Sequence, residues 1–503
     1  MDTVAPADLF VCASDTKDWP MYGHDVCNSR STRGGSITRE TASKLTTKWV
    51  FEAAGDVSAT PAIVGGALFI PDWGGMIHRL DAATGKVVWS KSVAALSGVR
   101  LEKGGPLVSR ATPAISDKSV IFGLSPTSMV ASRALAWIVA VDRETGALSW
   151  KTQLDTHPAS FITASPLFWE GRVIVGVSSG EEFASSADGY RCCSFRGSVA
   201  MLDASTGAIF WKTPLIDDAA HRAGFSGAPV WSGIAIDRKR GHVIVTTGND
   251  YAEAKGTAAV NHFDSIVALA LDSGAIRWAA RVTPSDHWVL ADAIDPGSAG
   301  PDADFGAGPN LFHAVIAGKE RDVIGAGQKS GVYWAVDAEN GELYWKTKIG
   351  PGGHFGGIHW GTAVDGARIY AGVNDEAAIP YTLAGDAGQI ARTGSWAALD
   401  PATGRIAWQI ANPAMARPLA GVSVNGPVTV VNGVVLAGSM DAAGTMFALD
   451  GTTGAVLWSF KSGGTVYGGA AVADGVVYWG SGYPAARLNF GTPSKKLYAF
   501  AIP

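Results

Sequence analysis

The sequence predicts an all-β protein, an eight-bladed β-propeller whose last blade combines strands from both ends of the chain. Three observations lead to this fold class. The composition suits many short strands and tight turns, because the chain has 63 glycines, 18 tryptophans and only 17% charged residues. A short motif with Asp, Gly and Trp recurs along the chain, and an apolar strand repeat precedes its copies. Recurrence of this kind is typical of propellers and solenoids.

The first repeat reads Leu/Val-Asp-x-x-Thr-Gly-x-x-x-Trp, with Asn for Thr in one copy. Asp and Gly suit a tight turn between two outer strands, and the Trp then takes a fixed place on the second of them, where its indole can bridge to the next sheet. A seventh copy is degenerate, with Ala270 in the Asp position and Trp278 retained. The other copies run from Leu80, Val141, Leu202, Val336, Leu399 and Leu449 to Trp89, Trp150, Trp211, Trp345, Trp408 and Trp458.

The second repeat is a small residue, usually followed by Pro, and then an alternating apolar strand. Its first copy begins at Ala59, and the seven others begin near Thr112, Ser165, Ala228, Gly308, Gly361, Gly426 and Gly469. The second repeat therefore marks the inner halves of eight blades, whereas the Asp/Trp repeat marks the outer halves of only seven. The Trp-containing outer half of the eighth blade is expected at the N-terminus, in residues 47–50.

These counts predict how the ring closes. We expect residues 469–503 to pair with residues 44–52, which leaves no open sheet edge. A linear solenoid is the alternative, but it needs polar capping repeats and neither end has one. Residues 1–503 are therefore interpreted as one propeller domain, with residues 1–43 as a segment packed on it.

Charge and hydropathy exclude some classes of partner. The formal net charge is -5 and no block of Lys or Arg occurs, so the chain lacks the basic stripe that nucleic-acid binding requires. No apolar run approaches the roughly 18–20 residues that span a bilayer, and the first residues lack the pattern of a signal peptide. We expect a soluble chain from which any signal peptide has been removed.

The connections between the repeated halves vary in length and are long in blades 3, 4 and 5. Long loops on a rigid scaffold often carry function. These loops hold the least repetitive residues of the chain, namely Glu181-Glu182, Cys192-Cys193, Thr247–Asp250 and Asp302–Gly306.

At these residues the whole chain resembles the quinoprotein alcohol dehydrogenases, and within them the polyvinyl alcohol dehydrogenase branch. The similar stretches are residues 18–24, 192–197, 302–306 and 328–331. The resemblance implies eight four-stranded blades, pyrroloquinoline quinone (PQQ) in the central channel, and a calcium ion beside it.

Three residues match the family's calcium ligands: Glu182, Asn249 and Asp304. Calcium takes about six to eight oxygen ligands, so two carboxylates and an amide suit it. The plain alternative is a turn asparagine and a solvated acidic pair. Gly306 stands where lanthanide-using relatives carry another carboxylate, so the resemblance favours calcium.

The resemblance also implies that Asp304 is the general base. Asp302 and Asp286 are the alternatives, because many relatives place the base directly after the Trp that matches Trp288, where this chain has Val289. An ordinary Asp has a pKa of about 3.9, so it acts chiefly as a positioned proton acceptor.

Five residues match contacts to the quinone. Arg110 would bind a carboxylate with its planar fork, and Lys329 would stabilise negative charge that develops on the reacting carbonyl. Trp231 matches the aromatic floor, and Thr163 and Asn374 match polar contacts at the rim of the ring. The alternatives are a core tryptophan and a solvated turn lysine.

Cys192 and Cys193 match the vicinal disulfide that forms the ceiling over the quinone in this family, although many relatives carry it in blade 2. Adjacent Cα atoms lie about 3.8 Å apart, below the usual disulfide range of roughly 4.4–6.8 Å, so such a bond is strained. Cys12 with Cys27 is the natural complement, and other pairings or free thiols remain open. Disulfides favour an oxidising compartment, the periplasm.

The implied reaction is oxidation of an alcohol, secondary or polymeric in this branch, with hydride transfer to the quinone. No Cys-x-x-Cys-His haem motif occurs, so electrons would pass to an external acceptor such as a cytochrome c. A cofactor-free propeller that serves as an assembly scaffold is the alternative function. The candidates for the site entrance are His354, Phe355, His359 and Trp360.

Overall fold

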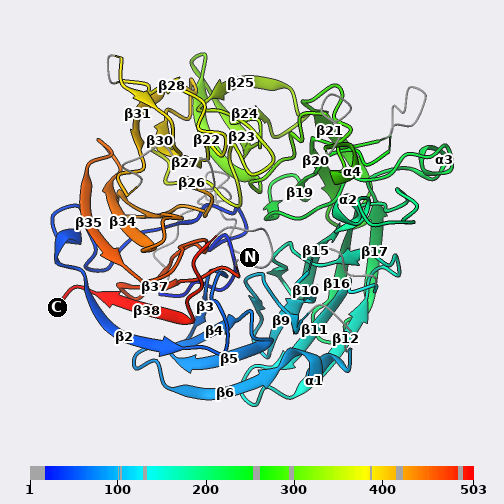
Figure 1. The fold of residues 1–503 in the computed structure, drawn as a ribbon, viewed down its shortest axis with the longest axis horizontal. Coiled ribbons are helices and arrows are strands. Elements are labelled where there is room, and N and C mark those ends of the chain that lie inside the picture. Colours follow the sequence, from blue (N-terminus) through cyan, green and yellow to red (C-terminus); the bar gives the residue numbers. More distant parts are fainter. Residues whose placement is uncertain are drawn as a thin grey trace, which may run out of the picture.

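The structure is a computed structural model and describes residues 17–99, 101, 105–128, 133–252, 261–293, 300–385, 388–414, 423–484 and 491–503. Eight antiparallel sheets stand around a central axis, and the chain passes through them in order (Figure 1). The predicted eight-bladed β-propeller is confirmed.

The first four blades each carry four strands that run from the axis outward. Their strands are, for blade 1, β3 (Ala62–Val64), β4 (Ala67–Pro71), β5 (Met76–Asp81) and β6 (Val87–Ser92); for blade 2, β8 (Ala114–Ile115), β9 (Ser119–Gly123), β11 (Trp137–Asp142) and β12 (Leu148–Gln153); for blade 3, β14 (Leu167–Trp169), β15 (Arg172–Ser179), β16 (Ser198–Asp203) and β17 (Ile209–Pro214); and for blade 4, β18 (Ala235–Asp237), β19 (His242–Thr246), β20 (Ser265–Ala270) and β21 (Ile276–Arg281).

The last four blades repeat this order. Their strands are, for blade 5, β22 (Asn310–Ile316), β23 (Lys319–Gly327), β24 (Val332–Asp337) and β25 (Leu343–Lys348); for blade 6, β26 (Ala363–Val364), β27 (Ile369–Val373), β30 (Ser395–Leu399) and β31 (Ile406–Ala411); for blade 7, β32 (Thr429–Val431), β33 (Val434–Gly438), β34 (Thr445–Asp450) and β35 (Val456–Lys461); and for blade 8, β36 (Ala471–Ala473), β37 (Val476–Gly480), β38 (Lys496–Ala501) and β2 (Thr46–Glu52).

The ring closes as predicted, through an antiparallel pairing of β2 with β38. The two strands lie side by side at the junction of the blue and red ends of the chain (Figure 1). The preceding N-terminal segment runs across neighbouring blades. Its strand β1 (Ser31–Thr32) pairs with β32 in blade 7, and Trp19 pairs with Ile63 in blade 1. Cys12 lies outside the described residues, so its pairing with Cys27 stays a prediction.

The repeated tryptophans link each blade to the next, as the sequence predicts. Each indole Nε1 donates to a backbone carbonyl of the following blade, at 2.9 Å for Trp150 to Ala204 and 2.9 Å for Trp458 to Leu45. Trp278, in the degenerate repeat, is the exception: its buried Nε1 has no hydrogen-bond partner among the described residues. The same links start from Trp49, Trp89, Trp211, Trp345 and Trp408.

This difference gives a matched test of the blade-to-blade hydrogen bond. Trp150→Phe removes the donor and leaves the Ala204 carbonyl without it, so we expect the free energy of unfolding to fall by about 1 kcal/mol more than in Trp278→Phe. Both changes remove the same atoms, which makes Trp278→Phe the control. Urea unfolding followed by tryptophan fluorescence measures both variants. Equal losses would mean that the bond adds nothing to stability.

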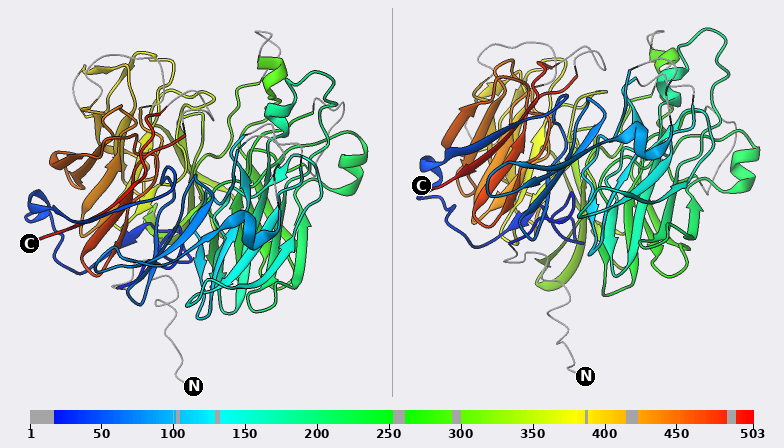
Figure 2. Two further views of the ribbon diagram at one scale, coloured as in Figure 1. Left: turned by 60° about the horizontal axis from the view of Figure 1, so that its bottom comes forward. Right: turned by 90° about the horizontal axis from the view of Figure 1, so that it is seen from below.

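Several short elements lie outside the four strands assigned to each blade. They are β7 (Leu107–Val108), β10 (Ser125–Pro126), β13 (Ser160–Phe161), β28 (Tyr381–Thr382), β29 (Ile390–Ala391), the 3-10 turn η2 (Ala42–Lys44), and the helices α1 (Val93–Ser97), α2 (Glu181–Ala184), α3 (Asp218–Arg222) and α4 (Leu290–Ala293). Helices α2 and α4 contact each other and project from one end of the ring (Figure 2).

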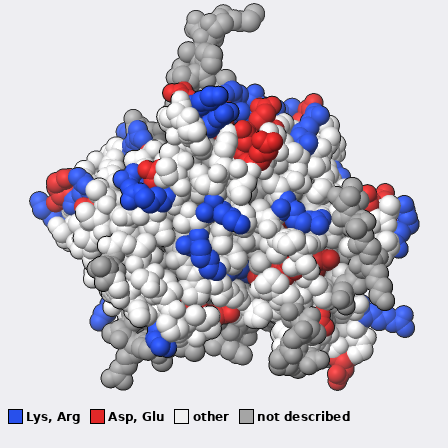
Figure 3. Space-filling model, turned by 90° about the horizontal axis from the view of Figure 1, so that it is seen from above, with Lys and Arg blue, Asp and Glu red and all other residues white. Residues whose placement is uncertain are grey.

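The core lies between neighbouring blades, where apolar side chains of adjacent sheets interleave in separate clusters. On the side of the ring in Figure 3, the described Lys and Arg side chains are separated by uncharged surface and mixed with Asp and Glu. No helix among the described residues has the length and apolar character needed to cross a bilayer.

Candidate active site

The candidate site lies on the central axis, where two cavities share one wall. In each blade the innermost strand and its neighbour are antiparallel, so residues that precede the first and residues that follow the second lie at the same end of the blade. One position recurs in this wall, four residues before the innermost strand. In six of the eight blades the residue at this position lines a cavity: Ser58, Arg110, Thr163, Trp231, His359 and Tyr467.

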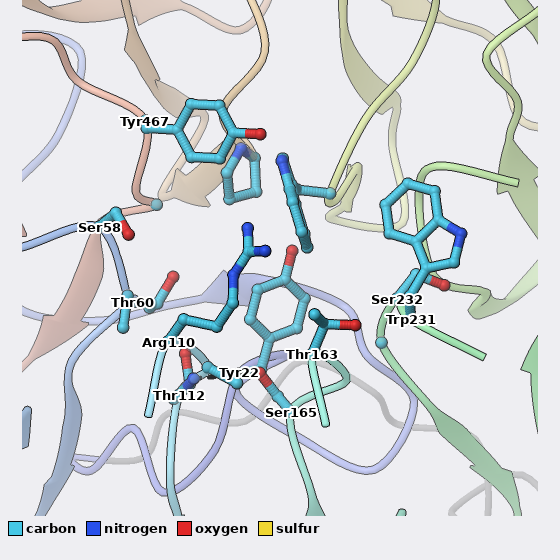
Figure 4. Close-up of a pocket in the computed structure, with 16 residues that line it drawn as sticks. Tyr22, Ser58, Thr60, Arg110, Thr112, Thr163, Ser165, Trp231, Ser232 and Tyr467 are labelled. Carbon is cyan, nitrogen blue, oxygen red and sulfur yellow. Dashed lines mark hydrogen bonds between the residues drawn. The ribbon is translucent and has the colours of Figure 1, made fainter. Parts of the chain in front are cut away.

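We call the first cavity the hydroxyl lobe because Tyr22, Ser58, Thr60, Thr112, Thr163, Ser165 and Ser232 line it. It spans about 470 Å³. Arg110 and Tyr22 reach into this space from different segments (Figure 4). The hydroxyls of Tyr22 and Thr112 are buried and have no partner among the described residues. The lobe therefore offers hydrogen-bonding groups that the protein itself does not satisfy.

We call the second cavity the charged lobe because Glu182, Asp304, Lys329 and Arg110 line it. It contains about 630 Å³ of empty space, which includes open solvent. The two lobes share Arg110, Thr163, Trp231, Trp360 and Tyr467.

The predicted base and the predicted lysine meet in the charged lobe. Lys329 Nζ lies 2.8 Å from Asp302 Oδ1 and 3.0 Å from Asp304 Oδ2, and all three side chains are at most 10% exposed. The second oxygen of Asp302 faces His354 Nδ1 at 3.1 Å. Asp304 Oδ1 accepts the Asn249 N–H at 2.5 Å.

Lys329 does not affect the two aspartates equally. Burial raises the pKa of Asp304, and the Lys329 ammonium opposes this without reversing it. Burial would also raise the pKa of Asp302, but Lys329 and the hydrogen bond from His354 outweigh it, so that pKa is lowered. Environments that push two carboxyl pKa values apart separate their roles. Asp302 is bound by Lys329 and His354, whereas Asp304 is bound by Lys329 and the Asn249 N–H and lines the charged lobe.

The three predicted metal ligands lie in the same region. Asn249 is fully buried, and its amide nitrogen donates to the carbonyls of Asp250 and Trp288 at 3.0 and 2.7 Å. Its Oδ1 has no donor among the described residues. Burial raises the pKa of Glu182 well above its ordinary value, and the charge of Asp304 adds to this.

This oxygen set is chemically suited to a hard cation, because an orphaned amide oxygen and two repelling carboxylates would all gain from one. No group of three or more His, Cys, Asp or Glu side chains spaced to hold a metal occurs in the described ranges. The site therefore depends on the amide of Asn249 and on further oxygens from a cofactor or water.

Aromatic and cationic side chains form the rest of the wall. Trp231 contacts Trp360 edge to face with ring centroids 5.3 Å apart, and Lys329 Nζ lies 5.7 Å from the Trp231 centroid. Arg110 has neutral neighbours: the Tyr483 hydroxyl at 3.3 Å and the rings of Trp73 and Trp360. Flat surfaces beside a cation that forms no ion pair with a described carboxylate suit a planar, negatively charged ligand.

Two predicted contacts lie elsewhere. Asn374 is not among the residues that line the two lobes, because its amide is occupied: Nδ2 donates to the Phe355 carbonyl at 2.5 Å and Oδ1 accepts the Ser423 N–H at 2.8 Å. Cys192 and Cys193 are joined by a disulfide but also lie outside the lining of both lobes. Cys193 packs against a hydrophobic cluster that includes Tyr251, and Tyr251 itself lines the charged lobe.

The entrance candidates His354, Phe355, His359 and Trp360 all line the charged lobe. Sequence reasoning missed Phe183, Tyr251, Tyr467 and Tyr483. The recurring position before the innermost strand would have identified Tyr467. The others lie in connections that the repeat does not align.

Known proteins resemble this chain in sequence and in fold. The sequence profile described as "Glucose/ethanol/alcohol dehydrogenase, beta-propeller domain", a PQQ domain, matches residues 19–351. A second profile, for the outer membrane protein assembly factor BamB, matches residues 392–489. The structure of the quinohemoprotein alcohol dehydrogenase from Comamonas testosteroni superposes with a TM-score of 0.73 at 20% identity, over 99% of this chain and 82% of that one.

Two relatives align over nearly the whole chain. Polyvinylalcohol dehydrogenase from Pseudomonas sp is 32% identical over 519 residues, which cover 95% of this chain and 75% of that protein. Polyvinylalcohol dehydrogenase from Sphingopyxis sp. is 29% identical over 541 residues, with coverage of 99% and 78%. The chain therefore belongs to the PQQ-dependent alcohol dehydrogenases, in the branch of the polyvinyl alcohol dehydrogenases.

Proposed function

We propose that this dehydrogenase binds calcium beside the quinone and oxidises secondary or polymeric alcohols to ketones or aldehydes, with Asp304 as the base. We further propose that it works in the periplasm and passes its electrons to an external acceptor such as a cytochrome c. The names of the two aligned relatives support a polymeric alcohol. The single observation that carries the proposal is the grouping of Asp304, Lys329 and the donor-free Asn249 oxygen at one cavity wall.

Glu182, Asn249 and Asp304 would hold the calcium ion. Gly306 supports calcium over a lanthanide that needs an additional carboxylate, because a Cβ built at Gly306 would lie 2.5 Å from the Ile358 carbonyl oxygen. A carboxylate side chain has no room there unless the backbone shifts.

Trp231, Arg110 and Lys329 would hold the quinone. Trp231 offers a flat wall, and Arg110 offers a guanidinium with neutral neighbours. When bound, PQQ supplies the two-electron acceptor and calcium supplies Lewis-acid polarisation of the reacting carbonyl. Lys329 adds a fixed positive charge at this wall, where it favours the development of negative charge.

Asp304 would receive the proton of the alcohol hydroxyl. Its Oδ1 is held by the Asn249 N–H and its Oδ2 by Lys329, so the carboxylate is fixed before the substrate arrives. Both contacts restrict rotation and favour a productive geometry. Asp302 and Asp286 suit this role less, because neither of them lines the charged lobe, whereas Asp304 does.

Reconstitution tests the proposal. Purified protein mixed with PQQ and calcium should quench tryptophan fluorescence and oxidise a secondary alcohol in a dye-linked assay, and a chelator should remove the activity reversibly. Glu182→Gln should weaken calcium binding by at least about 10-fold, the effect that loss of even an outer-shell partner has on metal sites. Glu144→Gln, at a 60% exposed carboxylate paired with Arg79, is the matched control.

Calcium affinity should also rise with pH. Burial keeps the pKa values of Glu182 and Asp304 above their ordinary values, so calcium must displace protons at lower pH. Calorimetry in two buffers of different ionisation enthalpy measures this proton release. A protein that neither binds PQQ nor oxidises any alcohol would contradict the proposal and favour the cofactor-free scaffold, for which the partial match to BamB is the supporting observation.

A further inference from the structure

Two buried aspartates lie behind the segment that carries the proposed base. Asp286 is 1% exposed, and Asp264 is fully buried. Neither lines the charged lobe or the hydroxyl lobe. The role proposed for Asp304 does not use them, and a buried carboxyl pair is costly unless it is satisfied.

Asp286 binds the backbone of the segment formed by residues 302–304. Its Oδ1 accepts the Asp302 N–H at 2.9 Å, and its Oδ2 accepts the Ala303 N–H. Asp302 has a φ of 52°, in the left-handed region that a non-glycine residue adopts only when the surroundings impose it. Gly300 also approaches closely, since a Cβ there would lie 2.7 Å from Asp286 Oδ1.

This attachment determines where two charged side chains point. One residue separates Asp302 from Asp304, yet both carboxylates reach Lys329 Nζ, at 2.8 and 3.0 Å. Asp286 binds the N–H groups of Asp302 and Ala303, in the backbone that joins the two side chains. Asp286 therefore acts on Asp304 through the backbone and not by direct contact.

Asp264 is the second carboxyl group of this buried pair, and we infer that it carries a proton. Neither of its oxygens accepts a hydrogen bond from the described part of the chain, and its carboxyl faces that of Asp286. Two ionised carboxylates here would repel each other and burial disfavours both charges, so a proton shared between them lowers the cost of burying the pair. Burial raises the pKa of Asp264 well above its ordinary value and raises that of Asp286 to about 6. The charged groups that face the pair are Asp250, Arg281, Asp302 and Asp304.

We propose that Asp286 is a positioning residue for the catalytic segment, and that Asp264 is the protonated acid that holds Asp286 in place. Asp264 donates one hydrogen bond to the Asp286 carboxylate, and Asp286 in turn accepts two N–H groups of the segment. The proposal rests on the role of Asp304 as the base, because only then does the position of residues 302–304 limit the rate.

The first test compares two buried carboxylates that bind backbone N–H groups. Asp286→Ala frees the segment, and a displacement of about 1 Å at a reacting group costs on the order of 100-fold in rate, so we expect kcat to fall by this factor with little change in KM. Asp237→Ala is the control, since Asp237 is fully buried and accepts the N–H groups of Lys239 and Arg240 at the end of β18 that lies farther along the chain from Trp231. A variant of Asp286 with wild-type kcat would overturn the proposal.

The second test examines the shared proton. Asp264→Asn keeps a donor toward Asp286 but cannot ionise, so it should retain kcat within a few-fold and extend activity to higher pH. Asp264→Ala removes the donor and should lower kcat as Asp286→Ala does, though less. An Asp264→Asn enzyme whose kcat falls as far as that of Asp264→Ala would overturn the role of Asp264.

The third test uses protein without PQQ or calcium, so it does not depend on the proposed function. A carboxyl whose pKa is raised on folding stabilises the native state below its unfolded pKa, and this contribution is lost as pH rises through its folded pKa. The melting temperature of the wild type should therefore fall with rising pH more steeply than that of Asp264→Asn. Identical slopes would overturn the shared proton. A wild type without turnover would contradict the proposed function while this comparison still decided the acid pair.

Discussion

Asp304→Asn is expected to lower kcat by about 10²–10⁴-fold, the contribution typical of a positioned general base. The amide is close in shape to the carboxylate and keeps an oxygen for the Asn249 N–H and for calcium. It cannot take up the proton of the alcohol. Calcium and PQQ affinity should therefore change much less than kcat, as calorimetry and fluorescence quenching would measure beside the dye-linked assay.

The alternative bases supply the controls for this experiment. Asp286→Ala should keep measurable turnover, because its effect reaches Asp304 only through the position of the backbone. Turnover that survives in Asp304→Asn and disappears in Asp286→Ala would transfer the role of base to Asp286. A loss of calcium binding in Asp304→Asn that matches the loss of kcat would make Asp304 a metal ligand alone.

Lys329→Met is expected to destabilise the protein without calcium by about 3–5 kcal/mol at neutral pH. Removing one partner of a buried ion pair leaves an uncompensated charge, and here Lys329 compensates both Asp302 and Asp304. In the variant, burial acts on both carboxyls without the ammonium, so their pKa values rise. The loss in the free energy of unfolding should therefore be largest at high pH and shrink as pH falls and both groups are protonated.

Urea unfolding of both proteins across pH measures this dependence. Lys212→Met is the matched control, because Lys212 pairs with Asp155 at 2.9 Å with both side chains partly exposed. Such a pair contributes about 1 kcal/mol or less. A Lys329→Met protein whose deficit did not change with pH would show that lost packing, and not unpaired carboxylates, accounts for the destabilisation.

The repeats predicted the ring because they encode contacts that recur in every blade. Asp and Gly form the turn, and the Trp after it reaches the carbonyl of the next blade, as Trp150 reaches Ala204. The count of half-blades also predicted the pairing of β2 with β38. Trp278 differs because its repeat is degenerate, and its indole has no partner among the described residues.

Several of the predicted site residues share one cavity wall because they occupy aligned positions in their blades. Arg110, Thr163 and Trp231 each lie four residues before an innermost strand, so the fold brings them to one wall. Asn374 follows β27 much as Asn249 follows β19. The difference is local: Phe355 and Ser423 occupy the amide of Asn374, whereas the Oδ1 of Asn249 has no donor among the described residues. The sequence alone does not show which side-chain amide is already hydrogen-bonded to neighbouring residues.

The pairing of β2 with β38 also governs how the molecule is made. Strand β2 leaves the ribosome before blade 1, but its partner in the register, Lys496–Ala501, follows only after blades 1–7. Contacts between distant parts of a chain form slowly because the loop between them must first be ordered. During synthesis β2 therefore lacks the strand that covers its hydrogen-bonding edge. The ring therefore stays open, and prone to association with other chains, until β38 is made. Short deletions within β38 should lower the yield of folded protein more than equal deletions in a surface loop.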